Sequence, residues 1–118
     1  MKAFQVLNAQ PILIRLSKAD LPLKISVELS RHFRAAFEIH KLIVERREAL
    51  YMKYGEHIPD KDQTVIPDEN KEVFCEEYTK LMQDELTWDL PPIDLEPFDE
   101  AGFRLSVEDA AKIEWFVS

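Results

Sequence analysis

The sequence predicts a mainly α-helical fold: a long helix with an antiparallel partner helix, short extended or β segments, and a C-terminal helix. Residues 26–54 contain no Gly or Pro and repeat apolar positions at helical spacing. The 118-residue chain has only 2 glycines, too few for the many tight turns of a sandwich or barrel. Hydrophobic residues make up 46% of the chain, enough for one core, so we expect residues 1–118 to form a single helical domain.

The first predicted helix is short and ends near Ala19. Pro11 suits its first turn, because the N–H that proline lacks would be unpaired there, and Asn8 can cap that turn. A strand at residues 4–7 is an alternative for the segment before it. Pro22 then separates this helix from the next, since the residue before a proline avoids the helical region. The apolar face of the helix would consist of Ile12, Leu13 and Leu16.

We predict the long helix over residues 26–54, where core-type positions recur at alternating spacings of four and three. At 1.5 Å per residue such a helix is about 43 Å long, which exceeds the diameter of about 26 Å expected for a compact 100-residue domain. It therefore either protrudes or is covered by several other elements. Gly55 follows it in the place of a C′ glycine. The repeat consists of Leu29, Phe33, Ala36, His40, Ile43, Arg47, Leu50 and Tyr54.

A polar connector over residues 55–69 separates the long helix from its partner, with a turn at 60–62 and a short strand at 64–66. A second helix fits residues 70–85, whose apolar residues recur at i, i+4, i+7 and i+8. We expect this helix to fold back on the long helix as an antiparallel hairpin. The predicted contact consists of Phe33, Ile43, Leu50, Phe74, Tyr78 and Leu81.

The rest of the chain carries weaker signals. Residues 86–90 alternate apolar and polar positions, which is strand periodicity, and prolines keep residues 91–98 extended. A final helix opens at Ser106, where Asp109 stands in place of the usual Glu of a capping box. The anchors of the extended segment and the apolar face of the final helix would consist of Ile93, Leu95, Phe98, Ala110, Ile113, Phe116 and Val117.

Charge is unevenly distributed along the chain. The net charge is −8 and the isoelectric point is about 4.9. Residues 1–54 hold 10 Lys or Arg against 5 Asp or Glu, a net of +5, whereas residues 55–118 hold 5 against 18, a net of −13. Either a basic helix packs beside acidic segments of the same chain, or two patches of opposite sign steer partners. The overall acidity disfavours direct binding of nucleic acid.

The sequence carries no recognisable catalytic, metal or cofactor motif. The histidines form no HExxH pair, and Walker and Rossmann signatures are absent. Asp60-x-Asp62 resembles the start of a calcium loop, but Val65 and Lys71 replace the Gly and Glu that such a loop requires. Adjacent carboxylates on a helix point about 100° apart and do not converge on a cleft. We therefore expect no enzymatic activity, no metal and no cofactor.

Two residues of chemically active types are interpreted as core residues. Cys75 falls in the apolar stripe of the second helix, and His40 lies in the seam of the long helix as a packed or hydrogen-bonded residue. Because Cys75 is the only cysteine, no disulfide can form within the chain, which suits a reducing compartment. The first residues lack the apolar core of a signal peptide, and apolar runs such as residues 12–14 are too short for a membrane span. The expected location is the cytoplasm.

Protein binding is the predicted role of the long helix. Its seam is longer than one second helix can cover, so we expect a homo-oligomer or a complex with a larger protein. The candidate partner-binding residues are Arg46, Arg47 and Tyr51, since Arg and Tyr bury wide area with directed hydrogen bonds. Arg47 lies within the seam, where it would snorkel, pair with a carboxylate of the second helix, or contact a partner. The alternative is that all three make ordinary intramolecular contacts.

The overall layout also supports a comparison with a known group of proteins. Residues 16–26, LSKADLPLKIS, lead into a long charged helix that ends in KYGE at residues 53–56, and LSVED follows at residues 105–109. In this layout the chain resembles small uncharacterised proteins encoded by tailed phages and prophages. The resemblance implies a phage origin and a helical hairpin. The protein would then be located in the host cytoplasm or incorporated in a virion.

Two functions follow as hypotheses. The first is non-enzymatic protein binding in phage assembly, as a virion or tail component or an assembly accessory, which the long helix favours. The second is inhibition of a host defence nuclease by an acidic surface that mimics nucleic acid, which the net charge of −13 over residues 55–118 favours.

Overall fold

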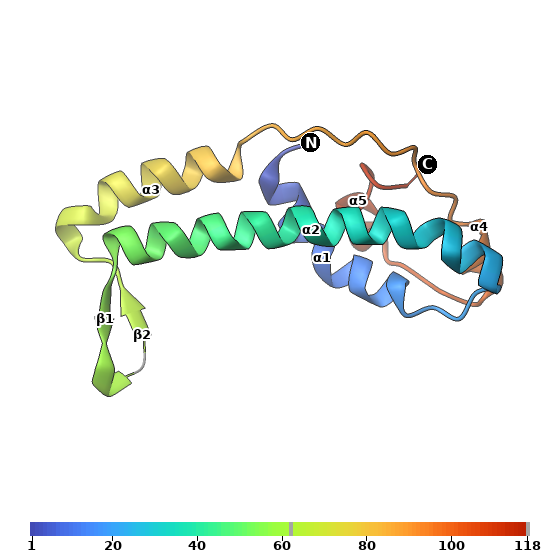
Figure 1. Ribbon diagram of the computed structural model, residues 1–118, viewed down its shortest axis with the longest axis horizontal. Coiled ribbons are helices and arrows are strands. Elements are labelled where there is room, and N and C mark those ends of the chain that lie inside the picture. Colours follow the sequence, from blue (N-terminus) through green and yellow to red (C-terminus); the bar gives the residue numbers. More distant parts are fainter. Residues whose placement is uncertain (62, 118) are drawn as a thin grey trace.

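The protein is mainly helical and elongated, which confirms the predicted fold class. A computed structural model describes residues 1–61 and 63–117. The molecule measures 53 × 31 × 25 Å and its radius of gyration is 17.6 Å, whereas a compact 100-residue domain has about 13 Å. The long helix α2, Leu23–Tyr54, runs along nearly the whole molecule and sets this shape (Figure 1).

Pro22 and Gly55 cap the two ends of α2. The helix begins at Leu23, earlier than predicted, because Pro22 has its φ fixed at −52° and serves as an extended N-cap. The predicted end at Tyr54 is confirmed. Gly55 then donates its N–H to the Tyr51 carbonyl at 2.7 Å with φ −90° and ψ 159°. Gly55 is therefore the C-cap residue with an extended backbone, and the prediction that it stands at C′ is wrong.

The first helix is longer than predicted. α1 spans Ala3–Ser17, so the alternative strand at residues 4–7 is wrong and Asn8 is an exposed helical residue, not a cap. Pro11 lies inside the helix on its exposed side and not in the first turn as predicted. The continuous buried face explains why the helix persists through the proline. That face consists of Ala3, Val6, Ala9, Ile12, Leu13 and Leu16.

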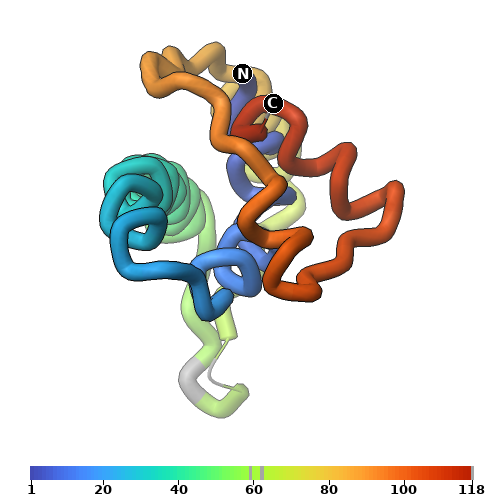
Figure 2. Tube along the Cα trace, turned by 90° about the vertical axis from the view of Figure 1, so that its right-hand side faces the viewer, coloured from blue at the N-terminus to red at the C-terminus, as the bar shows by residue number. Residues whose placement is uncertain are grey.

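Three elements share the cover of α2. α1 and the C-terminal segment pack on its first half, and α3, Asp68–Met82, packs antiparallel on its second half (Figures 1 and 2). The predicted hairpin of helices is therefore present, but Phe33 is not part of it, and Ile43 is buried with Ala3 and Val6 of α1. Phe33 belongs instead to the main core, which α1 and the C-terminal segment complete. The main core consists of Ala9, Ile12, Leu13, Leu16, Phe33, Ala36, Ile93, Phe98, Ile113 and Phe116.

The connection between α2 and α3 is a β-hairpin that projects from the helices (Figure 1). β1, Glu56–Ile58, pairs antiparallel with β2, Gln63–Val65, and the short 3-10 helix η1, Pro59–Lys61, lies between them. The predicted short strand at 64–66 is confirmed with a shift of its bounds, whereas β1 was not expected. The predicted turn and calcium-like loop include Asp62, which lies outside the described residues.

Gly55 allows this hairpin to leave the end of α2. A Cβ at this position would overlap the Tyr51 carbonyl oxygen and would lie 2.5 Å from Thr64 Cγ2. Gly55→Ala should therefore lower the free energy of unfolding by about 1–3 kcal/mol, as overpacking does elsewhere. Urea denaturation checks this value. Gly102→Ala is the matched control, since Gly102 has φ +83° with nothing within 4 Å of its Cβ, and only the backbone cost of about 1–2 kcal/mol applies. A wild-type denaturation midpoint for Gly55→Ala would contradict this account of the junction.

The C-terminal segment is less regular than predicted. Residues 86–90 form no strand, because α1 begins at Ala3 and leaves only a short N-terminal stretch for Leu86 to pair with. Residues 91–98 are not extended throughout, since α4 covers Glu96–Glu100. Ile93 and Phe98 are nevertheless buried anchors, as expected.

The final helix α5, Val107–Lys112, is capped as predicted. Ser106 Oγ accepts the Asp109 N–H at 3.0 Å. The Asp109 carboxylate does not complete a capping box, because it forms an ion pair with Arg15 at 3.3 Å. α5 ends before Ile113 and Phe116, which are fully buried in the turns that follow.

Candidate interaction surfaces

The three predicted partner-binding residues do not form one patch. Arg46 and Tyr51 are five positions apart on α2, which places them about 140° apart around the helix. The Tyr51 ring packs on Phe74 of α3, with 5.1 Å between ring centroids, so it makes an intramolecular contact. Arg46 is exposed and borders two hollows beside α2, one against α3 and one that also reaches Ala3 of α1.

Arg47 and His40 form a half-buried pair within α2. Among the described residues Arg47 makes no ion pair with α3, so the predicted pairing is not found. Burial, and after it the positive charge of Arg47, lower the pKa of His40 below its ordinary value. His40 is only half-buried and belongs to neither buried cluster, so its interpretation as a core residue is not confirmed.

Cys75 is not a core residue. It is exposed on α3, because α3 turns its aromatic residues Phe74 and Tyr78 toward α2 and points the next position about 100° away. α3 has no fully buried residue, so its apolar stripe is narrower than the sequence suggested.

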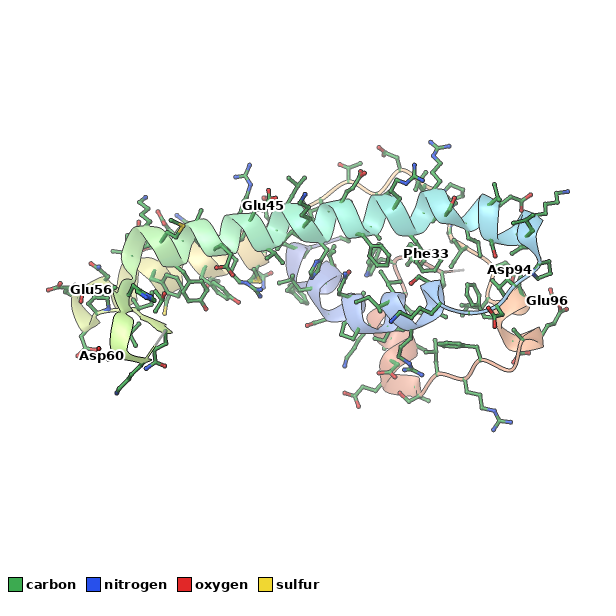
Figure 3. All side chains as sticks on the ribbon, turned by 60° about the horizontal axis from the view of Figure 1, so that its bottom comes forward. Phe33, Glu45, Glu56, Asp60, Asp94 and Glu96 are labelled. Carbon is green, nitrogen blue, oxygen red and sulfur yellow. The ribbon has the colours of Figure 1, made fainter. Side chains whose placement is uncertain are left out.

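The described residues form an apolar groove of about 510 Å³, which we call the α1–α2 groove. It lies between the end of α1, the first half of α2 and Phe98 of α4. Figure 3 shows Phe33, one of its lining residues, on the side of α2 that faces α1. Its lining consists of Leu16, Ser17, Ala19, Leu21, Ser26, Leu29, Ser30, Phe33, Arg34, Phe37, Glu38, Lys41 and Phe98.

The hydroxyl groups in this groove are bonded to the backbone around them. Ser17 donates to the Ile14 carbonyl at 2.7 Å, and Ser30 donates to the Val27 carbonyl at 2.7 Å. Ser26 donates to the Leu21 carbonyl at 3.4 Å. Because these hydroxyl protons are already used within the chain, the groove presents mainly apolar surface to a ligand.

Sequence reasoning missed this groove. The signal in the sequence was the helical spacing of Leu29, Phe33 and Phe37, of which only Phe33 was predicted to contact the second helix. The groove also needs Leu16 and Phe98, and no local pattern brings residues so far apart in the chain together.

The described residues offer no cluster of metal-binding type, since no three His, Cys, Asp or Glu side chains lie close enough to hold an ion. Within residues 1–61 and 63–117, no helix combines the length and apolar composition needed to cross a membrane. No family model, curated protein or solved structure matches the chain. Inference about function therefore depends on the geometry of the surfaces.

Proposed function

We propose that the protein acts without catalysis, by binding another protein whose apolar side chains seat in the α1–α2 groove. The observation that carries this proposal is an open groove of about 510 Å³ that is lined by buried and half-buried apolar residues and by hydroxyls bonded within the chain, with the charged residues Arg34, Glu38 and Lys41 beside them. Burial of one leucine-sized side chain there contributes about 1.5–3 kcal/mol to binding. Leu29 and Phe37 supply apolar walls for such a contact.

The biological setting that we propose is phage assembly, with the protein as a virion or tail component or an assembly accessory. This setting comes from the resemblance of the sequence to phage-encoded proteins. The alternative, a nucleic-acid mimic that inhibits a defence nuclease, needs a continuous acidic face. Figure 3 places Glu56 and Asp60 at one end of the molecule and Asp94 and Glu96 at the other, so these four carboxylates do not form one cluster.

Photocrosslinking in phage-infected cells tests the groove directly. A photoreactive phenylalanine analogue at Phe37 should crosslink to one stoichiometric partner, whereas the same analogue at Val107, which is 90% exposed, should not. A virion protein as partner supports the assembly role, and a host nuclease supports the alternative. Absence of a stoichiometric partner would overturn the proposal.

A pair of substitutions at Ser17 tests whether the groove must stay open. Ser17→Arg places a long charged side chain at the groove wall and should reduce recovery of the partner at least about tenfold, or about 1.4 kcal/mol. Ser17→Ala leaves the groove open and should keep recovery within about twofold. Melting temperatures of both variants establish that folding is intact. Equal recovery with the two variants would show that the partner binds elsewhere.

A further inference from the structure

α2 carries a second repeat on the side that the rest of the chain leaves open. Eight residues follow each other at alternating spacings of four and three, and all eight are exposed. Figure 2, which looks along α2, shows this helix at one edge of the molecule, and Figure 3 shows Glu45 on the side of α2 away from α1. We call this set the outer stripe, and it consists of Val27, Arg31, Arg34, Glu38, Lys41, Glu45, Glu48 and Met52.

The charges of the outer stripe are self-complementary when two copies run antiparallel. The alternating spacings of four and three read the same in both directions along the helix. In an antiparallel pair, each stripe residue therefore faces the residue of the second copy that lies equally far from the midpoint between Glu38 and Lys41. Glu38 then faces Lys41 of the second copy. The remaining facing pairs are Arg34 with Glu45, Arg31 with Glu48, and Val27 with Met52.

A parallel arrangement in register lacks this complementarity. Each charged residue would then face its own counterpart, Arg31 against Arg31 and Glu45 against Glu45, and like charges at such positions repel. Opposite charges favour the antiparallel orientation, and twofold symmetry makes every facing pair occur twice. The stripe therefore specifies both the identity of the partner and its orientation.

The charged residues of the outer stripe are free for this contact. Among the described residues, no charged residue of the stripe takes part in an ion pair. An ion pair between α2 and α3 joins Lys53 to Glu77, and neither belongs to the stripe. Two of the stripe residues are large and apolar, with Val27 63% and Met52 83% exposed. Leu42, 59% exposed, follows Lys41 near the midpoint and adds apolar surface beside the stripe.

We propose that two copies of this protein associate through antiparallel packing of their outer stripes. Exposed ion pairs contribute only about 0–1 kcal/mol each, so the dimer is weak and sensitive to salt. The proposal does not depend on the groove partner, although Arg34, Glu38 and Lys41 also line the rim of the α1–α2 groove. Its test therefore uses Arg31 and Glu48, which do not line that groove.

Charge exchange at one facing pair tests the proposal. Sedimentation velocity of the full chain at about 50 mM salt should show a monomer–dimer equilibrium that about 0.5 M salt suppresses. Arg31→Glu and Glu48→Arg should each raise the dissociation constant at least about tenfold, because each replaces two attractive contacts with repulsive ones. The double variant should return it to within about threefold of wild type. These positions lie about 26 Å apart along one helix, so the rescue must act between copies.

Disulfide trapping tests the orientation separately. In a Cys75→Ser background, which removes an exposed thiol, a mixture of Val27→Cys and Met52→Cys chains should crosslink to each other in preference to themselves. A wild-type protein that stays monomeric at low salt, a double variant as weak as the single variants, or preferential crosslinking of Val27→Cys to itself would each overturn the antiparallel dimer.

Discussion

Phe116→Ala should lower the free energy of unfolding by about 3–5 kcal/mol, the range for a large aromatic side chain removed from a packed core. Phe116 is fully buried. Its ring lies 5.2 Å from that of Phe33 on α2, 5.6 Å from Trp88 and 5.5 Å from Trp115, centroid to centroid. One ring therefore joins the long helix to two distant parts of the C-terminal segment, and its loss leaves a cavity at that junction.

Denaturant titration measures this effect, with the fluorescence of Trp88 and Trp115 as a probe beside the cavity. Val107→Ala is the matched control on the same segment, because Val107 is 90% exposed and its truncation should change stability by less than about 0.5 kcal/mol. A loss below about 1 kcal/mol for Phe116→Ala would show that the C-terminal segment does not complete the core.

Local signals in the sequence were sufficient for α2, α3 and the cap of α5. The long helix needs only an uninterrupted repeat between Pro22 and Gly55, and the Ser106 cap needs only its own hydroxyl and the Asp109 N–H. Pro11 misled the prediction of α1, because it was taken to mark the first turn of a helix and lies in the interior of one. The continuous buried face of α1 outweighed the local cost.

The periodicity of the sequence could not show which distant elements pack against each other. The seam of α2 shows that something covers it, but the same apolar spacing is satisfied by α1, by α3 or by a second molecule. The structure assigns the seam as far as Ile43 to α1 and the C-terminal segment, and the remainder to α3. The candidate residues suffered from the same ambiguity, because Arg46 and Tyr51 are close in sequence yet lie on different sides of α2.

Phe33 and Phe74 show how this ambiguity can be measured. Phe33 is 7% exposed and belongs to the main core. Phe74 is half-buried among Tyr51, Tyr54 and Tyr78, with ring centroids 5.1, 6.5 and 5.8 Å away. Phe33→Ala should therefore cost about 3–5 kcal/mol. Phe74→Ala should cost less, about 1–2 kcal/mol, because its ring is only partly removed from water.

A double-mutant cycle distinguishes one continuous core, in which Phe33 and Phe74 share a cluster, from the two separate clusters of the structure. Because Phe33 and Phe74 lie in different clusters, the two losses should add to within about 0.5 kcal/mol in denaturant titrations. Phe33 and Phe116 are in contact at 5.2 Å and should instead show a coupling of about 0.5–1.5 kcal/mol. A coupling above about 1 kcal/mol between Phe33 and Phe74 would restore the single seam between the long helix and α3 that the sequence pattern predicted. Additivity places the main core where α1 and the C-terminal segment meet, and leaves α3 as an independent cover of the second half of α2.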